Sequence, residues 1–493
     1  MDWGFDNTFA RELDWLAVAV DPVPVAEPRL LLLNESLAVE LGLDPEWLRT
    51  PAGVAVLAGN ARAEGSQPLA QAYAGHQFGQ FSPLLGDGRA HLLGEVVDIH
   101  GQRRDLALKG SGRTPFSRGG DGRAALGPVL REYVMGEAMH ALGVPTTRAL
   151  AAVATGEQVW RDGGPRPGAV LTRVAASHLR VGTAELVRMR AGDEQQASFA
   201  AYVRRRHHPG VAEGDHLGLL SAVVEAQAEL LARWMSLGFI HGVMNTDNMT
   251  LSGETIDYGP CAFLEAHDPA AVFSSIDTGG RYRFGAQPGI AQWNLARYAE
   301  TLLPLLAPDP SADPEIIEAA TERIRAFGPA FDRAHLRQWR TRLGLDLVEG
   351  RGVEEDQVLV EDLLSLLRSE RLDHTRTVRL LGRVARGETS VVTELVEDPA
   401  RWSQWQDAWL AALAPALPDG VAAARMDQVN PLHIPRNHLV EEALAAALTG
   451  DLAPLEELVR VVSDPFVERA GQERYAAPAP ADFTAGYVTY CGT

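Results

Sequence analysis

One lysine stands alone among the 45 basic side chains of this sequence. The other 44 are arginine, and the lysine is Lys109. A composition rich in Ala, Gly, Pro and Arg indicates a GC-rich genome, which explains the loss of lysines but not the survival of one. Lysine differs from arginine because it is a compact point charge on a flexible stem. We therefore expect Lys109 to do chemistry that an arginine cannot do.

The residues around Lys109 have the composition of an anion-binding loop. The segment 109–127, KGSGRTPFSRGGDGRAALG, combines glycine with arginine, serine and threonine. Free backbone N–H groups and guanidinium groups both bind phosphate oxygens. Upstream, the residues GDGR at 86–89 form a glycine turn with an arginine that suits a phosphate. The order of these residues is not that of a P-loop.

A second set of candidate residues lies in segment 239–265, FIHGVMNTDNMTLSGETIDYGPCAFLE. Protein kinases have H-R-D-x-x-x-x-N in their catalytic loop, followed by D-F-G. Here His241 precedes Asn248 at that spacing, and Asp257, Tyr258 and Gly259 form a triplet like D-F-G. Asn and Asp at these positions provide oxygen ligands for Mg²⁺ beside phosphates. The segment therefore predicts a nucleotide and metal site.

One position of this segment departs from the kinase pattern. The catalytic aspartate should lie two residues after His241, where this chain has Val243. A valine side chain cannot accept a proton. Asp247, directly before Asn248, is the substitute carboxylate. Without such a substitute, the chain would bind a nucleotide but transfer nothing.

A glycine turn, a strand lysine and a helix with acidic residues follow one another as in a kinase N-lobe. In kinases the lysine holds nucleotide phosphates and pairs with a glutamate of that helix. The predicted helix offers Glu132 and Glu137, which lie about 140° apart around its axis because they are five residues apart. Glu137 falls within the apolar stripe, and Glu132 lies on the opposite side. Helical geometry alone does not choose between them.

The elements that must position these residues follow from the apolar pattern. Apolar runs over 91–99 and 105–109, with Gly101 and Gln102 between them, predict two strands and a turn. Pro128 near its start and Gly143 just past its end predict a helix of about 14 residues. We expect strand, turn and strand over 159–174, a helix over 221–238, loop and short strands over 241–265, and helices after about 290.

The elements indicate an α+β chain in four parts. We expect a helical N-terminal lead-in over 1–83 and a β-rich lobe with one main helix over 84–185. A helical lobe with the catalytic and metal-binding loops is expected over 186–305, and a helical extension with a cysteine-containing tail over 306–493. A cleft between two lobes is a common ligand site. In the extension, Trp402, Trp405 and Trp409 recur at helical spacing, which predicts a helix core.

Composition excludes several classes of protein. With 46% hydrophobic and 22% charged residues, the 493-residue chain is globular rather than disordered. Its net charge of −20 disfavours nucleic-acid binding. The two cysteines, Cys261 and Cys491, form no CxxC pair for zinc. The N-terminus is unlike a secretory signal, and no apolar run reaches the ~18 residues of a membrane span, so we expect a soluble cytoplasmic protein without membrane partners.

Longer motifs resemble a known family. YAGHQFGQFSPLLGDGRAHLLGE, LALKGSGRTPFSRGGDGRAAL, LTRVAASHLRVGT, HGVMNTDNMTLSGETIDYGPCAF and the terminal YCGT are similar to the selenoprotein O family of protein adenylyltransferases. The resemblance covers nearly the whole chain. It implies a protein-kinase-like two-lobed fold that transfers AMP, not phosphate, from ATP to hydroxyl side chains of proteins. It also implies that ATP is bound in an orientation opposite to that in kinases, with the γ-phosphate buried and the α-phosphate facing the acceptor.

The resemblance assigns roles to individual residues. ATP is the implied substrate, and Mg²⁺ or Mn²⁺ the implied metal. The implied nucleotide contacts are Gly86, Gly88, Arg89, Lys109, Asp121, Gly122, Arg173, Arg180 and Asp257. Asn248 and Asp257 are implied to hold the metal, and Asp247 to act as the base.

The resemblance favours Glu132 as the partner of Lys109, with Glu137 kept as the alternative. A buried triphosphate needs several cations, and Lys109, Arg173 and Arg180 supply three beyond the metal. Arg173 and Arg180 lie in a segment that ordinary kinases do not use. The plain alternative for both is a solvated surface arginine.

Two other functions fit part of the pattern. A kinase that moves the γ-phosphate to a protein or small molecule would use the same lysine and metal, but Val243 stands at the position of its base. A non-catalytic nucleotide-binding regulator would not need the complete set of Lys109, Asn248 and Asp257. Label transfer from ATP distinguishes the three functions.

The remaining candidate residues have plainer interpretations. A disulfide between Cys261 and Cys491 that gates the site is a hypothesis, and a small core residue is the alternative for Cys261. His207 and His208 follow three arginines, and we interpret this segment as a solvated basic loop.

Overall fold

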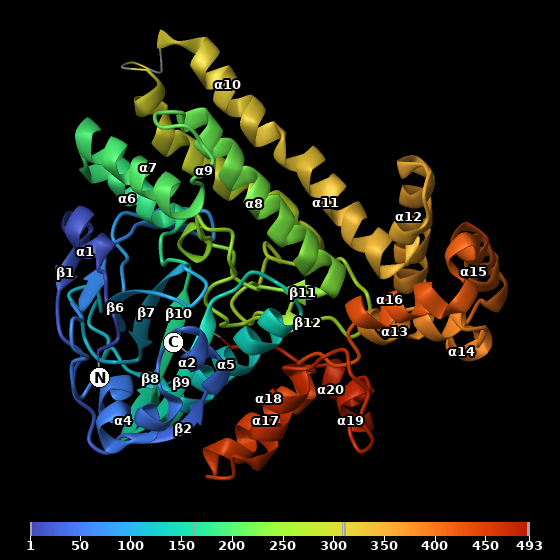
Figure 1. Cartoon of the computed structure of the whole chain (residues 1–493), viewed down its shortest axis with the longest axis horizontal. Helices are drawn as coiled ribbons and strands as arrows, with labels where there is room; N and C mark the ends of the chain where they lie inside the picture. The colour runs from blue at the N-terminus through green and yellow to red at the C-terminus, as the bar shows by residue number, and fades with distance from the viewer. Residues whose placement is uncertain (1, 162, 308, 310–311, 491–493) are drawn as a thin grey trace.

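A computed structural model describes residues 2–161, 163–307, 309 and 312–490 of the chain. It has the predicted α+β architecture, because one antiparallel sheet lies against a larger body of helices (Figure 1). In Figure 1 the sheet occupies one side of the molecule, and the long helices α8 (His216–Leu237) and α9 (Gln287–Leu306) lie above it. The helix α11 (Phe327–Arg342) packs along α8, farther from the sheet. None of the described helices has the length and apolar character needed to cross a bilayer.

The main sheet has the strand order β1-β3-β6-β7-β10-β9-β2, and β8 pairs with β10. Its strands are β1 (Ala17–Ala19), β2 (Arg29–Leu33), β3 (Leu69–Gln71), β6 (Ala90–Val97), β7 (Arg103–Lys109), β8 (Ala124–Ala125), β9 (Arg148–Arg161) and β10 (Gly164–Ala175). The predicted hairpin is present, since β6 and β7 are joined by a turn in which Gly101 has a φ of +77°. A positive φ of this kind is accessible to glycine at little cost. The second predicted pair, β9 and β10, is also present, although β9 begins well before residue 159.

The N-terminal lead-in is not purely helical, which corrects our expectation for residues 1–83. It contains α1 (Thr8–Glu12), α2 (Glu35–Glu40), α3 (Pro45–Arg49) and α4 (Pro51–Ala58). It also contributes β1 and β3 to one edge of the sheet and β2 to the other edge. The run Leu30 to Leu33 is too short for its periodicity to distinguish a strand from a helix. The sheet therefore continues across the boundary that we predicted at residue 83.

The main helix of this lobe is α5 (Leu126–Ala141), as predicted, and Gly143 just beyond it has a φ of +75°. The next part of the chain forms α6 (Val181–Arg190), α7 (Asp193–His207), α8 and α9. α8 ends at Gly238, which has the left-handed conformation typical of a glycine cap. Between α8 and α9 the chain runs through β11 (Phe239–Ile240), a short 3-10 turn (Thr246–Asn248) and β12 (Ala262–Phe263).

Besides the contact of α11 with α8, the C-terminal extension packs in two places. Its helices are α10 (Pro314–Arg325), α11, α12 (Val353–Ser369), α13 (His374–Ala385), α14 (Ser390–Thr393), α15 (Pro399–Leu413), α16 (Val421–Val429), α17 (Asn437–Leu448), α18 (Ala453–Val462), α19 (Glu473–Ala476) and α20 (Ala481–Thr484). Trp402, Trp405 and Trp409 of α15 are buried in a separate core with α11, α12 and α13, which confirms the predicted helix core. By contrast, α17 and α18 pack on α5, where Arg131 and Glu441 form an ion pair of 3.1 Å.

Candidate active site

Lys109 is the last residue of β7 and faces two carboxylates. Its Nζ lies 2.6 Å from Oε2 of Glu132 on α5 and 2.8 Å from Oδ1 of Asp257. The first of these contacts is the lysine–glutamate pair that the resemblance implied. The single lysine of the chain therefore joins the strand, the helix and the loop that follows the catalytic segment.

The alternative partner, Glu137, lies elsewhere. It forms an ion pair with Arg148 of β9 at 2.7 Å and accepts a hydrogen bond of 2.7 Å from Asn34. Five residues of helix turn its side chain away from Glu132. The side of α5 that bears Glu137 faces β9 and the lead-in, and the side that bears Glu132 faces Lys109.

Two buried arginines complete the group of cations. Arg173 of β10 lies 2.6 Å from Oδ1 of Asp257 and 3.3 Å from Oε1 of Glu132. Arg180, just before α6, lies 3.9 Å from Asp257 and 3.7 Å from Asp87. The two side chains are only 3% and 2% exposed, so they are not solvated surface arginines. Buried charges require paired or liganded partners.

Asp257 is the carboxylate at the centre of this group. Burial alone would raise the pKa of this carboxyl, but the three cations around it outweigh that effect and hold the pKa well below its usual range. Asp257 has a φ of +60°, a conformation that is strained for a non-glycine residue. A charged carboxylate held in a strained loop is typical of a functional site.

The residues present fit a divalent cation that takes the rest of its ligands from the phosphates of a nucleotide. Among the described residues, no group of three or more His, Cys, Asp and Glu could hold a metal by itself. Asn248 donates a 3.0 Å hydrogen bond from Nδ2 to the carbonyl of Val243, which leaves its amide oxygen available. Together with the carboxylate of Asp257 this gives the hard oxygen donors that Mg²⁺ or Mn²⁺ accepts beside phosphates.

The catalytic segment is held from behind by His241. Its Nε2 donates a 2.8 Å hydrogen bond to the carbonyl of Ile256, and its ring stacks on Trp234. Val243 is only 6% exposed and belongs to the apolar core. No proton acceptor therefore occupies the position of the kinase base.

Asp247, the substitute carboxylate, lies in the 3-10 turn between Thr246 and Asn248. Gln77 donates a 3.2 Å hydrogen bond from Nε2 to Oδ2 of Asp247. Its other oxygen, Oδ1, is buried and accepts no hydrogen bond from the described residues. Burial raises the pKa of Asp247 to about 6. At neutral pH this carboxyl is mostly ionised and has one oxygen free to accept a proton.

A small hairpin covers Asp247. It consists of β4 (Gly75–Gln77) and β5 (Gln80–Ser82), which belong to the motif YAGHQFGQFSPLLGDGRAHLLGE. Its backbone bonds to the catalytic segment, since His76 N donates to Thr246 Oγ1 at 2.7 Å and Phe78 N donates to Asn245 Oδ1 at 3.0 Å. The hairpin thus fixes the turn that carries Asp247.

We expect Gly182→Ala to displace this hairpin. A Cβ at residue 182 would lie 2.2 Å from the carbonyl oxygen of Ala74, next to β4. Overpacking of this kind costs about 1–3 kcal/mol of unfolding free energy. Thermal unfolding and AMP transfer should both report the loss, whereas Gly192→Ala, with no atom within 4 Å of its new Cβ, should change neither. Native stability and activity of Gly182→Ala would show that the hairpin is not needed there.

The remaining implied contacts flank this cluster. Gly86 has a φ of +104°, and both it and Gly88 lie against Phe116 so closely that a Cβ would clash. Arg89 is half-buried and forms no ion pair within the described part of the chain. Asp121 pairs instead with Arg161 at 2.8 Å.

Gly122 lies in the same loop as Asp121, where its carbonyl accepts a hydrogen bond from Gly112 N at 2.9 Å. Its φ is +69°, and a Cβ there would collide with the Gly112 backbone. The structure therefore brings Lys109, Arg173, Arg180 and Asp257 together. It places Asp121 and Gly122 in the neighbouring loop that follows β7.

Of the two cysteines in the hypothetical disulfide, only Cys261 lies within the described residues. Cys261 is a buried free thiol, and burial raises its pKa to about 11. This fits a small core residue. Cys491 lies outside the described residues. The last described residues lie near Cys261, because Thr489 Oγ1 donates a 2.7 Å hydrogen bond to the carbonyl of Pro260.

Comparison with known proteins shows the family to which the chain belongs. The sequence profile described as "Protein adenylyltransferase SelO" matches residues 2–463. This chain belongs to the SelO family. A "Protein nucleotidyltransferase YdiU" from Cereibacter sphaeroides is 55% identical over 495 residues and covers 100% of both chains. Another from Mycolicibacterium smegmatis is 55% identical over 493 residues, which cover 99% of this chain and 98% of the relative.

Membership of the SelO family confirms the resemblance seen in the motifs and makes the chain an enzyme, a protein adenylyltransferase.

The sequence did not identify every residue of this site. Asp87, Gln77, Asp105 and His178 were missed as individual site residues. Asp87 lies in the GDGR turn, and Gln77 and His178 lie in the longer motifs, but no spacing pattern gives a role to any of the four. The interpretation of the segment before His208 as a solvated basic loop was wrong.

That segment is the end of α7, and its basic residues are held by specific partners. Arg206 is buried between Glu95 and Asp105, 2.7 Å from each. His207 is half-buried and hydrogen-bonds Ser177 Oγ at 2.7 Å. The local run of basic residues suggested solvent, but the acidic partners come from β6 and β7.

Proposed function

We propose that this enzyme transfers AMP from ATP to Ser, Thr or Tyr hydroxyls of proteins and releases pyrophosphate, with ATP bound in the orientation opposite to that of kinases. The observation that carries the proposal is the pair of buried arginines, Arg173 and Arg180, around Asp257. The end of ATP with the highest charge is the triphosphate tail, and buried guanidinium groups are the best partners for it. With the tail held there, the α-phosphate is the phosphate left for the acceptor.

In this proposal Asp247 is the base. A hydroxyl oxygen of the acceptor attacks the α-phosphorus, and the bond between this phosphorus and pyrophosphate breaks. The hydroxyl proton moves to Oδ1 of Asp247. If the transition state is loose, the proton moves late and the carboxylate chiefly orients the hydroxyl. Gln77 on Oδ2 supports this role because it leaves a single oxygen free.

The metal that we propose is Mg²⁺ or Mn²⁺, held by Asn248 and Asp257. When bound, it would neutralise charge on the phosphates and on the departing pyrophosphate. Lys109, fixed by Glu132, would add a point charge to a phosphate oxygen. Gly86, Gly88 and the guanidinium of Arg89 would line the same nucleotide, as would Asp121 and Gly122 beyond it.

We also propose the setting in which the enzyme acts. The nucleotide would lie between a kinase-like N-lobe, 84–185, and a kinase-like C-lobe, 186–305. The partners would be cytoplasmic proteins with hydroxyl side chains, rather than nucleic acid or membrane. The acidic net charge of −20 supports the exclusion of nucleic acid.

Pyrophosphate release tests this function directly. We expect the purified enzyme to release pyrophosphate from ATP in step with modification of an added acceptor protein, and only with Mg²⁺ or Mn²⁺ present. Chelation of the metal should stop release, and addition of excess metal should restore it. Release of ADP in step with modification would contradict the proposal, because ADP is the product of a kinase.

Lys109→Ala is expected to weaken both ATP binding and transfer. Loss of a cation that stabilises developing charge costs about 10²–10³-fold in rate. Lys109→Arg is the matched control, because it keeps the charge but replaces the point charge by a planar fork. We expect it to restore part of the binding in a calorimetric titration and little of the transfer. Full activity of Lys109→Arg would show that the lone lysine survived by chance.

A further inference from the structure

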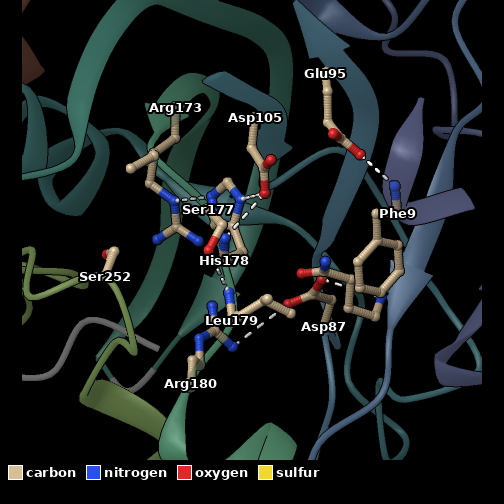
Figure 2. A network of polar contacts seen from close by, with 12 residues as sticks. Phe9, Asp87, Glu95, Asp105, Arg173, Ser177, His178, Leu179, Arg180 and Ser252 are labelled. Atoms are coloured by element: carbon tan, nitrogen blue, oxygen red, sulfur yellow. Dashed lines mark hydrogen bonds and ion pairs between the residues drawn. The ribbon is translucent and has the colours of Figure 1, made fainter. Parts of the chain in front are cut away.

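Arg173, His178 and Asp105 form a line of three buried side chains (Figure 2). Arg173 Nε lies 3.1 Å from His178 Nε2, and His178 Nδ1 lies 3.0 Å from Asp105 Oδ2. A guanidinium only donates hydrogen bonds, so Nε2 of His178 must be the acceptor. The proton of the neutral ring is therefore on Nδ1, from which it is donated to Asp105.

The register of the sheet explains why these residues meet. Asp105 and Lys109 are four residues apart on β7 and so point to the same face of the sheet. Arg173 of β10 pairs with Ala107, midway between them. His178 follows β10 in the segment that leads to α6, and that segment returns toward β7. Lys109 and Asp105 thus occupy the two ends of one face, with Arg173 between them.

Asp105 is itself firmly held. Arg206 donates to Oδ1 at 2.7 Å, and the backbone N of His178 donates to Oδ2 at 2.9 Å. Burial alone would raise the pKa of Asp105, but Arg206 and His178 outweigh it, and the pKa is lowered. Burial lowers the pKa of His178. A charged Asp105 and a neutral His178 are the states that this hydrogen-bond line requires.

This line of hydrogen bonds fixes the orientation of the Arg173 guanidinium. Its Nε donates a hydrogen bond to His178, and its Nη1 donates to Asp257 and Glu132. Its Nη2 has no hydrogen-bond partner among the described residues. An acceptor on Nε prevents rotation of the planar group and so fixes the direction of Nη2.

We infer that His178 is a positioning residue that holds Arg173, through its Nε2, in the orientation that receives a terminal phosphate of ATP. The inference rests on the proposed function, in which Arg173 binds the triphosphate tail. His178 does not itself touch the nucleotide. Asp105 fixes the tautomer that makes Nε2 an acceptor.

Two substitutions distinguish the roles of the two ring nitrogens of His178. The amide of His178→Gln reaches the place of Nε2, where its oxygen can accept from Arg173. The amide of His178→Asn reaches only the place of Nδ1, where it can donate to Asp105 but cannot reach Arg173. If His178 acts through Arg173, Gln preserves the function and Asn does not. If His178 only anchors its loop on Asp105, Asn is the better substitute.

The experiment compares KM for ATP, kcat and direct binding of ATP and AMP in these variants. We expect His178→Asn to raise KM and Kd for ATP about 10-fold or more, to leave Kd for AMP unchanged, and to change kcat less. His178→Gln should stay within about threefold of the native chain. Arg173→Ala and the double variant Arg173→Ala with His178→Asn should bind ATP equally, since contacting residues are not additive.

His207→Gln is the matched control, because His207 bonds Ser177 in the same segment without contacting Arg173. It should leave KM for ATP unchanged even if the melting temperature falls. Equal behaviour of the Gln and Asn variants of His178, or a further loss in the double variant, would overturn the inference. A native chain that binds ATP but transfers no AMP would contradict the proposed function, and the binding comparison would still decide the role of His178.

Discussion

Asp247→Ala is expected to lower AMP transfer by about 10²–10⁴-fold, the usual contribution of a general base. ATP binding should stay nearly unchanged, because Asp247 contacts none of the described cations within ion-pair distance. Gln77 donates to its Oδ2, and its Oδ1 accepts no hydrogen bond from the described residues. Single-turnover transfer and a separate binding titration measure the two effects.

Asp247→Asn is the matched control for shape. It keeps the size of the side chain and one carbonyl oxygen but cannot take up a proton, so its transfer rate should be close to that of the alanine variant. Recovery of native activity in the asparagine variant would show that the residue only orients the acceptor. Full activity of both variants would exclude Asp247 as the base.

Asp257→Asn is expected to reduce transfer by about 10³-fold, because a bound metal ion contributes several kcal/mol to charge stabilisation. The same change removes a negative charge that pairs with Lys109 and Arg173 and that would repel a phosphate. Metal-free ATP should therefore bind at least as tightly as it does to the native chain. The two opposite effects distinguish loss of a metal ligand from loss of folding.

Titration of ATP with and without chelator, beside transfer at saturating Mg²⁺, measures both effects for Asp257→Asn. Asp277→Asn provides a comparison at a buried aspartate outside the site, whose carboxylate accepts hydrogen bonds from the backbone of Arg281 and Tyr282. This variant should lose stability but retain the metal dependence. Native transfer by Asp257→Asn would contradict the metal site that we propose.

Local spacing was enough to find part of the site. Asn248 and Asp257 follow His241 at kinase spacing, and Lys109 is conspicuous as the only lysine. Spacing could not choose between Glu132 and Glu137, because a helix pattern does not say which side faces the sheet. Only packing decides this, through Arg148 and Asn34 on one side of α5 and Lys109 on the other.

The contacts that support the site could not be predicted from the sequence, for a related reason. His178 and Asp105 are 73 residues apart in sequence, and Arg206 and Asp105 are 101 apart. Their meeting depends on the strand order β7-β10 and on the return of the chain after β10, which no motif encodes. The lead-in strands β1 and β2 were missed because edge strands of three and five residues carry little periodicity.

Label transfer from ATP is the most direct test of adenylylation by this chain. Purified enzyme, an acceptor protein and Mg²⁺ are incubated in parallel with ATP labelled at the α-phosphate and at the γ-phosphate. Retention of label on protein from the α position alone is the predicted result. Label from the γ position alone would identify a kinase and contradict the inverted nucleotide. Label from neither position, with ATP bound, would favour a non-catalytic regulator or an acceptor protein that is not a substrate, and addition of a lysate distinguishes the two.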